Sequence, residues 1–568
     1  NEDCPSWKIT ANKIIHNKKK KRIIYSNAWL NLFDVPVLYF PKFFHPDPTV
    51  KRQSGFLSPT LASSVSSNGS AINVPYYFDL AENKDLTFKP KFYTNDNPLF
   101  QAEYREVKKN SELIIDASYN SGYKNKSSKK SSGSRNHFFA KSKINLDFDA
   151  FETSELNLKL QKVNNDTYLR VHNIKSDEEL IKSYTQLNSS INLNLKKENS
   201  SFELDMNVYE NLASTDNRYE YEVPTYNFQK DMLSSSSIGT LKFQSRGSYR
   251  KYNTNIDESK FVNDIYWLSN DYYNDMGLIT KFEGNIKNSN YDADKSASFK
   301  NESTNIEFAG ALSMTNSIPL EKRFDNSTRI ITPKLMFRYS PMHMRDLNSS
   351  GLRLNNSNLY TLNKVSEIDV LEKGTSLTIG SDYKILNSFN DYNFLELSLG
   401  QVYNLDANSD LPTSSSLNKK SSDVVGYFDL GISEDSSFKY SFSLDNNLNT
   451  LNYNEIGATF KVNKLISDFS YFEERNFIGS NHYANLALNY LLDDTKTINF
   501  TTRKDFNTDA TEFINWNFEY ENDCLRAALE FNRTFYKDRD VEPDDEIFIN
   551  FTFIPFGQIN SPAIQTLK

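Results

Sequence analysis

The chain has 568 residues, a formal net charge of -8, 38% hydrophobic residues and a mean hydropathy of -0.63. Low apolar content is typical of disorder, but the 14% aromatic share argues against it, because disordered chains are poor in aromatic residues. The negative charge and the dispersed basic residues argue against nucleic acid as the main partner. Strands with one apolar and one wet face, where Phe and Tyr are favoured, fit this composition.

The first 34 residues predict a hairpin of two short strands. Trp7–Ile15 and Arg22–Phe33 are rich in β-branched and aromatic residues, and a polar stretch separates them. We interpret the basic run Lys18–Arg22 as a solvated turn in preference to a phosphate site. The chain opens with NEDCPSW, without Met or a signal peptide, which suggests a processed or truncated product.

The segment Val35–Pro59 predicts a junction between a small region, residues 1–50, and a very large one, residues 51–568. Proline fixes φ and has no N–H to donate, so no helix or central strand is expected through this cluster. Its aromatic residues are too many for a solvated linker, which predicts a packed, rigid crossing. The prolines and aromatics are Pro36, Pro41, Pro46, Pro48, Pro59, Tyr39, Phe40, Phe43 and Phe44.

Beyond the junction, apolar and polar residues alternate with period two, as in Ser201–Tyr209, Phe438–Asp445 and Ile514–Tyr520. Polar loops rich in Ser, Asn and Lys separate such stretches, and no fixed short repeat indicates a propeller or solenoid. No uncharged apolar run reaches the roughly 18 residues of a membrane helix, but a transmembrane barrel never shows one. Soluble β-sandwiches, in contrast, would need interdomain linkers and inward faces of small aliphatics.

We therefore predict an all-β chain dominated by one transmembrane outer-membrane β-barrel. About 510 residues, at roughly 20 per strand and turn, predict a strand number in the mid-twenties. A lumen that wide must be plugged or gated. The six histidines show no metal-ligand spacing, and no G-x-S-x-G, HExxH or glycine-rich phosphate loop occurs, so neither an enzyme nor a cofactor is predicted.

Several short motifs occur in order along the chain. They are C-x-x-W at Cys4 and Trp7, VPVLYFP at Val35–Pro41, KRQSGFLSP at Lys51–Pro59, PYY at Pro75–Tyr77, EYR at Glu103–Arg105, YLR at Tyr168–Arg170, SDVVG at Ser422–Gly426, and YENDC ending at Cys524. Together they resemble the LptD (OstA, organic solvent tolerance) family of outer-membrane LPS-assembly proteins. The chain departs from the family in its short region before the barrel and in having two cysteines where well-known members carry four.

The resemblance implies a 26-stranded barrel that follows a periplasmic β-jellyroll, with residues 1–50 as the last part of that jellyroll. It implies a cell outer membrane location and a non-enzymatic role in inserting lipopolysaccharide (LPS) into the outer leaflet. The implied partners are a lipoprotein plug (LptE-like) in the lumen and a periplasmic bridge protein (LptA-like). Alternatives are a porin or receptor channel for small solutes, an outer-membrane hydrolase built from separate strands, and a soluble adhesin.

Pro59 and Pro75 are the predicted lateral-gate residues, in the first and second barrel strands. Each removes a ladder N–H, worth on the order of 1 kcal/mol net, so a seam between the first strand and the last, roughly Glu546–Ile554, would be locally weak. In the alternative interpretation, these prolines only mark strand ends or bulges. The gate is preferred because both prolines match positions in the resembled family.

Cys4 and Cys524 are predicted to form a disulfide, because two thiols pair in an oxidising compartment and stay free in a reducing one. The bridge would close a loop of more than 500 residues, worth about 5 kcal/mol in the chain-entropy model. It would also hold the small region beneath the seam. The aromatics at the junction, Tyr39, Phe40, Phe43 and Phe44, are possible walls of a lipid path or simple core residues.

Overall fold

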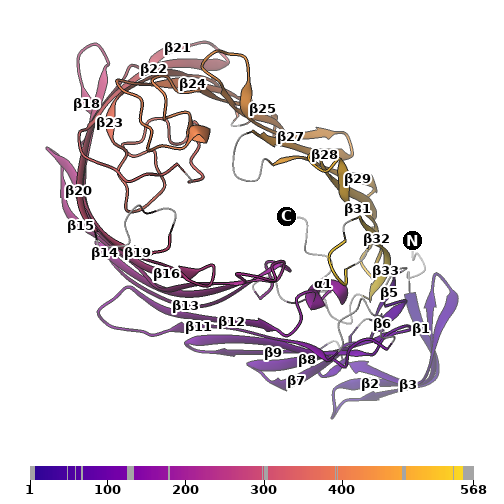
Figure 1. Cartoon of the computed structure of the whole chain (residues 1–568). Helices are drawn as coiled ribbons and strands as arrows, with labels where there is room; N and C mark the ends of the chain where they lie inside the picture. The colour runs from indigo at the N-terminus through magenta and orange to yellow at the C-terminus, as the bar shows by residue number, and fades with distance from the viewer. Residues whose placement is uncertain are drawn as a thin grey trace.

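The computed structural model describes residues 7–553 apart from 48, 51, 58, 65–67, 125–132, 175, 177–179, 297–298, 300–304, 349, 391, 393, 476–480, 536 and 542. These residues form a three-stranded antiparallel sheet followed by a closed antiparallel β-barrel (Figure 1). Thirty strand segments make up the barrel, and because four of its strands are each divided into two segments, it has 26 strands. The predicted all-β barrel is confirmed.

The N-terminal sheet consists of β1 (Trp7–Asn17), β2 (Arg22–Leu32) and β3 (Val35–Pro46) in that order. The predicted hairpin is present, with its turn at residues 18–21. The packed crossing predicted for Val35–Pro59 is wrong over residues 35–46, because Tyr39 and Phe44 are 43% and 41% exposed on a strand. Since β3 is an edge strand, it tolerates prolines that a central strand would exclude.

The first barrel strand consists of β4 (Gly55–Phe56) and β5 (Thr60–Ser64), and the second of β6 (Ala71–Asn73) and β7 (Tyr76–Ala81). Two further strands are divided in the same way, into β17 (Ile256–Leu268) with β18 (Tyr272–Tyr273), and β20 (Asn305–Ser317) with β21 (Leu320–Arg323). The undivided strands are β8 (Lys84–Tyr93), β9 (Leu99–Lys108), β10 (Ser111–Asn120), β11 (Arg135–Asn145), β12 (Thr153–Val163), β13 (Gln186–Lys197), β14 (Ser200–Asn211), β15 (Tyr219–Ser235), β16 (Gly239–Tyr252), β19 (Ile279–Asp294), β22 (Ser327–Ser340), β23 (Gly374–Asn387), β24 (Phe394–Asn404), β25 (Val424–Ser433), β26 (Ser436–Leu444), β27 (Leu451–Val462), β28 (Leu465–Glu474), β29 (His482–Asp493), β30 (Lys496–Asp505), β31 (Ala510–Glu521), β32 (Leu525–Thr534) and β33 (Asp544–Phe553).

Alternation along the strands places apolar side chains outside the barrel and polar side chains inside. On β19, Ile286 is 63% exposed, whereas the next residue, Lys287, is 3% exposed and pairs with Asp264 of β17 at 2.7 Å. On β20, Ile306, Phe308 and Leu312 form a similar exposed apolar row. An outward apolar face with a polar interior is the arrangement of an outer-membrane barrel.

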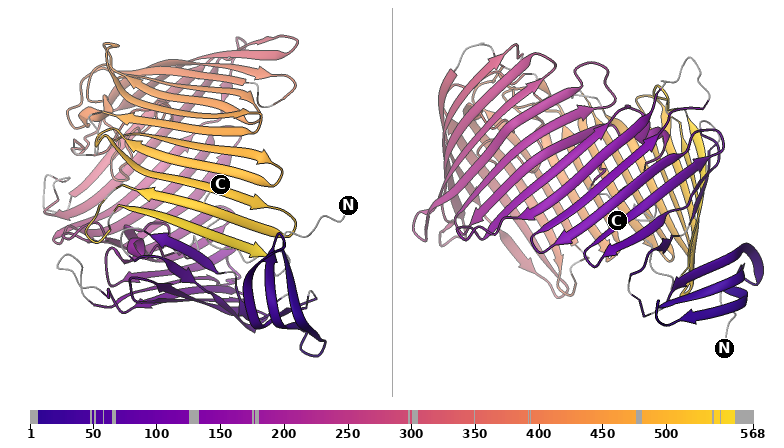
Figure 2. Two further views of the ribbon diagram at one scale, coloured as in Figure 1. Left: turned by 90° about the vertical axis from the view of Figure 1, so that its right-hand side faces the viewer. Right: turned by 90° about the horizontal axis from the view of Figure 1, so that it is seen from below.

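The two rims of the barrel differ, and we name them by what they carry. The sheet-side rim holds the connections β7–β8, β9–β10 and β31–β32 and lies beside the N-terminal sheet (Figure 2). The loop-side rim holds the longer connections, including β12–β13, β22–β23, β24–β25 and β32–β33. Hairpins alternate between the rims because all neighbouring barrel strands are antiparallel.

Three of the longer connections fold into the barrel (Figure 1). The β22–β23 connection packs with β24–β25, which carries the short 3-10 helix η1 (Thr413–Ser415), around a core that includes Met344, Leu359 and Leu417. The β12–β13 connection carries α1 (Tyr168–Val171), whose Tyr168 and Leu169 are fully buried. The wide lumen is thus partly filled by the chain itself.

No helix in the described part of the chain is long and apolar enough to cross a membrane.

Candidate site at the barrel seam

The barrel closes where its last strand, β33, meets β5 of its first strand. The ladder joins Glu546–Asn550 to Thr60–Ser64, five residues on each side. On its other edge, β33 pairs with β32 along its whole length, Asp544 to Phe553. The segment β4 pairs with β7. Among the described residues, the ladder that joins β33 to the first strand covers the loop-side part of the seam, Thr60–Ser64.

Both predicted gate residues lie at breaks in the strands beside this seam. Pro59 separates β4 from β5 and is exposed, whereas Pro75 separates β6 from β7 and is buried. The Pro75 carbonyl accepts a hydrogen bond from the Leu57 N–H at 2.9 Å, which ties the two breaks together. Because a proline offers no N–H, neither position can donate a backbone hydrogen bond to a neighbouring strand. The role of these prolines in gating stays a prediction.

The inner wall of the barrel next to the seam is rich in carboxamide side chains. A hollow of about 430 Å³ lies against the inner faces of β29 to β33, and Trp516 and Ala528 also line it. Its polar lining residues are Asn489, Thr497, Asn499, Thr501, Asn515, Asn517, Glu519, Arg526, Glu530, Asn532 and Asn550. Carboxamides both donate and accept hydrogen bonds, so this wall suits hydroxyl-rich groups without requiring a charge.

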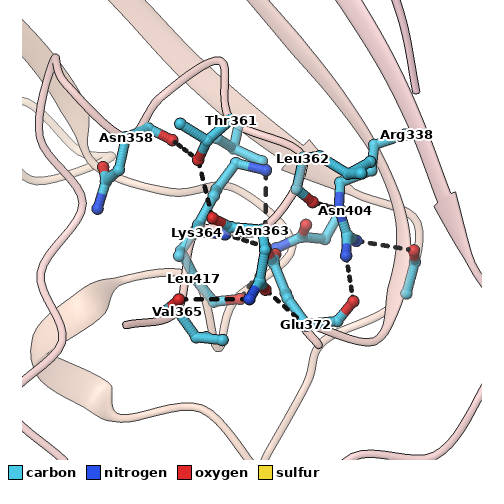
Figure 3. A network of polar contacts seen from close by, with 12 residues as sticks. Arg338, Asn358, Thr361, Leu362, Asn363, Lys364, Val365, Glu372, Asn404 and Leu417 are labelled. Carbon is cyan, nitrogen blue, oxygen red and sulfur yellow. Dashed lines mark hydrogen bonds and ion pairs between the residues drawn. The ribbon is translucent and has the colours of Figure 1, made fainter. Parts of the chain in front are cut away.

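The opposite part of the lumen holds the inward-folded β22–β23 connection, which is fastened to the wall (Figure 3). Arg338 of β22 donates to the backbone carbonyls of Leu362 at 2.5 Å, Gly374 at 3.3 Å and Glu372. Within the connection, Lys364 and Glu372 are buried, and Lys364 Nζ lies 3.6 Å from Glu372 Oε2. This connection forms a fixed block, and the carboxamide wall lies on other strands, β29 to β33, across the barrel from it (Figure 1).

A buried polar chain on β10 and β11 has the residue types of a hydrolase triad. His137 Nδ1 lies 2.6 Å from Ser118 Oγ, and His137 Nε2 lies 3.1 Å from Asp116 Oδ1. The Ser118 hydroxyl also bonds the Tyr168 hydroxyl of α1, and all four residues are buried. A nucleophile covered in this way has no room for a substrate, so we interpret the chain as the anchor of α1. No metal-binding cluster of His, Cys, Asp and Glu occurs among the described residues.

The N-terminal sheet meets the barrel next to the predicted disulfide. The indole N–H of Trp7 donates to the Cys524 carbonyl at 2.7 Å, and the Phe33 and Tyr520 rings lie 6.0 Å apart. Cys4 lies outside the described residues, so its pairing with Cys524 stays a prediction. The Trp7 hydrogen bond places the described end of β1 beside Cys524, and Cys4 lies only three positions before Trp7 in the sequence.

The four predicted lipid-path aromatics all lie on β3. The Phe40 and Phe43 rings are 5.2 Å apart, and Tyr39 packs on Trp29 of β2 with centroids 5.1 Å apart. Phe44 lies under the guanidinium of Arg22 at 5.3 Å. A role in guiding acyl chains stays a prediction for these side chains.

Ion pairs that cross the seam at its loop-side end have no counterpart among the sequence predictions. Arg170 pairs with Asp538 at 2.5 Å, Arg135 with Asp540 at 2.7 Å, and Arg539 with Asp166 at 2.9 Å. Arg170 belongs to the YLR motif, but nothing local in the sequence signals its partner 368 residues away.

The protein-family model described as "LptD: LPS transport system D" matches residues 134–520. The LPS-assembly protein LptD of Psychrobacter cryohalolentis is 40% identical over 121 residues, 20% of this chain and 12% of that protein. That of Methylococcus capsulatus is 39% identical over 106 residues, 18% of this chain and 10% of that protein. The aligned stretch is thus a small part of the length of these relatives.

Solved barrel structures align along most of the chain but superpose poorly. The FrpB iron transporter from Neisseria meningitidis covers 96% of this chain and 95% of its own, with 9% identity and a TM-score of 0.36. The FauA receptor from Bordetella pertussis covers 94% and 81%, with 11% identity and a TM-score of 0.28. TM-scores this low support no conclusion about this barrel.

The family match over residues 134–520, more than half of the chain, together with the closed 26-stranded barrel, shows that this chain belongs to the LptD family of outer-membrane LPS-transport proteins.

Proposed function

We propose that this chain is a non-enzymatic LPS translocon that delivers LPS to the outer leaflet through a lateral gate between its first and last barrel strands. The observation that carries the gate is the seam itself, where a five-residue ladder closes the barrel beside strand breaks at Pro59 and Pro75. Family membership supports LPS as the cargo.

The two surfaces of the barrel suit the two halves of such an amphiphile. The carboxamide wall beside the seam offers hydrogen bonds to sugar hydroxyls, which would stay in the wet lumen. The outer face exposes apolar residues such as Leu61 and Ile549 on either side of the seam, where acyl chains would enter the lipid. A parted seam would let one molecule pass with each half in its own solvent.

We propose that the N-terminal sheet is the last part of a periplasmic β-jellyroll that hands LPS to the seam. Among the described residues, β3 forms one edge of the sheet and exposes apolar side chains, which suits continuation of the sheet by further strands. An LptA-like bridge protein would supply LPS from that direction, and an LptE-like lipoprotein would occupy the open part of the lumen. A Cys4–Cys524 disulfide, supported by the Trp7 contact, would hold the sheet in place.

Locking the seam tests this function. Leu61 and Ile549 face each other across the seam, so Leu61→Cys with Ile549→Cys would allow a disulfide between β5 and β33. The matched control, Leu529→Cys with Ile549→Cys, joins register partners on β32 and β33, which need not separate.

We expect oxidation to stop delivery of LPS to the cell surface in the seam variant, with recovery on reduction, and to leave the control unchanged. Surface LPS is measured by accessibility to a lipid A-modifying enzyme in cells that depend on the variant. Normal delivery through a quantitatively locked seam would refute the gate.

A further inference from the structure

The loop-side end of the seam is bridged by side chains as well as by backbone. Asp166 and Arg170 of the β12–β13 connection and Arg135 of β11 meet Asp538, Arg539 and Asp540 of the β32–β33 connection, in the three ion pairs described above. We call these six residues the clasp. Its two halves belong to opposite sides of the seam, since β11 to β13 follow the first strand and β32 to β33 end the barrel.

The half on the first-strand side is rigid. Tyr168 and Leu169 of α1 are fully buried in a core that includes Phe139, Ile174 and Leu180. The Tyr168 hydroxyl is fixed by Ser118 of β10. Asp166 and Arg170 therefore project from a packed platform, and the ion pairs can break without unfolding that platform.

The half on the last-strand side is a short turn. Asp538 and Val541 exchange backbone hydrogen bonds of 2.9 and 2.8 Å, which closes the turn around Arg539. Arg539 also donates to the Leu212 carbonyl at 2.6 Å, on the first-strand side of the seam. The hydrogen bond from Arg539, followed by that from Arg170, lowers the pKa of Asp538 against the opposing effect of burial, so this carboxylate is charged at neutral pH.

Parting of the seam would leave buried charge without its partner. The side chains of Arg135 and Asp540 are only 2% and 9% exposed, and a buried charge that loses its partner is strongly destabilised. Asn173 adds a 3.3 Å hydrogen bond to Glu546 at the start of the seam ladder. The described side-chain contacts across the seam thus gather at its loop-side end.

We propose that the clasp is the lock of the lateral gate: its ion pairs hold the loop-side end of the seam closed, and breaking them permits the seam to part. The clasp rests on the proposed gate but is testable without LPS. Its measurable consequence is the protection of backbone amides in the seam ladder, at Thr60–Ser64 and Glu546–Asn550.

The test is hydrogen exchange, followed by mass spectrometry, on the purified full chain in detergent. The variant Asp538→Asn with Asp540→Asn keeps side-chain size and removes two of the charges. The matched control is Glu474→Gln, which breaks the Arg353–Glu474 pair of 2.8 Å, with both side chains 8% exposed, away from the seam. We expect seam amides to exchange at least tenfold faster in the clasp variant, with β22 and β23 unchanged, and wild-type exchange at the seam in Glu474→Gln.

Unchanged seam exchange in a folded clasp variant would overturn the lock, as would equal acceleration in the control. If the double variant does not assemble, Arg539→Gln gives the same readout, since Arg539 and Asp166 are 31% and 24% exposed and tolerate loss of the charge better. Because no LPS is present, a failed LPS-delivery experiment leaves this result standing, and a failed exchange experiment leaves the proposed cargo untouched.

Discussion

Replacing the two prolines beside the seam should close the gate. Pro59→Ala together with Pro75→Ala supplies an N–H at each strand break and allows strand φ and ψ there. A new backbone hydrogen bond contributes about 0.5–1.5 kcal/mol net, so the one gained at Pro59, in the strand that meets β33, would stabilise the closed seam by about that much. The population of the parted seam would then fall by roughly 2- to 12-fold, since about 1.4 kcal/mol is a factor of ten.

The two positions are not equivalent, and single variants separate them. Pro59 is exposed in the first strand, so alanine there extends β5 toward β4 with little loss of packing. Pro75 is buried, and its carbonyl already accepts the Leu57 N–H, so alanine there loses some ring contacts. We expect Pro59→Ala to account for most of the effect.

The assay has two readouts at matched protein levels in the outer membrane. Surface LPS should fall in the double variant, and amides of the seam ladder, at Thr60–Ser64 and Glu546–Asn550, should gain protection from exchange. A control, Pro333→Ala within β22, lies far along the barrel from the seam and should change neither readout. Unchanged LPS delivery together with unchanged protection would refute the argument that these prolines weaken the seam.

Three further predictions concern the parts that flank the seam. Burial, followed by the nearby charges of Lys91 and Arg135, lowers the pKa of His172 well below 6.5. As the pH falls, the unfolded chain therefore binds the proton first, and the stability of the α1 platform should fall below about pH 6.5. Hydrogen exchange of residues 164–173 at pH 7.5 and 5.5 measures this stability, and equal protection at the two pH values would contradict the prediction. Reduction should slow the migration of the denatured chain on a gel if Cys4 and Cys524 are paired, and Cys4→Ser should cost up to about 5 kcal/mol of stability; identical migration with and without reductant would exclude the bridge. Arg338→Ala should loosen the inward-folded β22–β23 connection, because each hydrogen bond from a charged donor contributes about 1.5–3 kcal/mol. The expected result is faster proteolysis within residues 341–373 while the barrel remains folded.

Much of the barrel is predictable because its information is local. The alternation in Ser201–Tyr209 reappears as β14 (Ser200–Asn211), and that in Ile514–Tyr520 as β31 (Ala510–Glu521). Period two alone assigns a side chain to the wet or the apolar face of a strand. Prolines are also local signals, since each lacks one ladder N–H, and the first two barrel strands are divided at Pro59 and Pro75, although β22 continues through Pro333.

The junction at Val35–Pro46 shows where local reasoning fails. Its prolines and aromatics predict a packed crossing, yet the segment is an edge strand with exposed rings. Proline content limits the pairing of one edge of a strand, but whether a neighbour covers the faces depends on other parts of the fold. Aromatic density by itself does not report burial.

The sequence by itself determined the class of the molecule: alternating strands, polar turns, an apolar exterior and a first strand broken by proline. Only the tertiary structure decided that the ladder between β5 and β33 is five residues long, that the β22–β23 connection fills part of the lumen, and that Arg170 meets Asp538. The physical reason is the distance along the chain over which each interaction acts. Strand periodicity and proline chemistry act within a few residues, whereas barrel closure and ion pairing join residues hundreds of positions apart, which the chain brings together only when it folds.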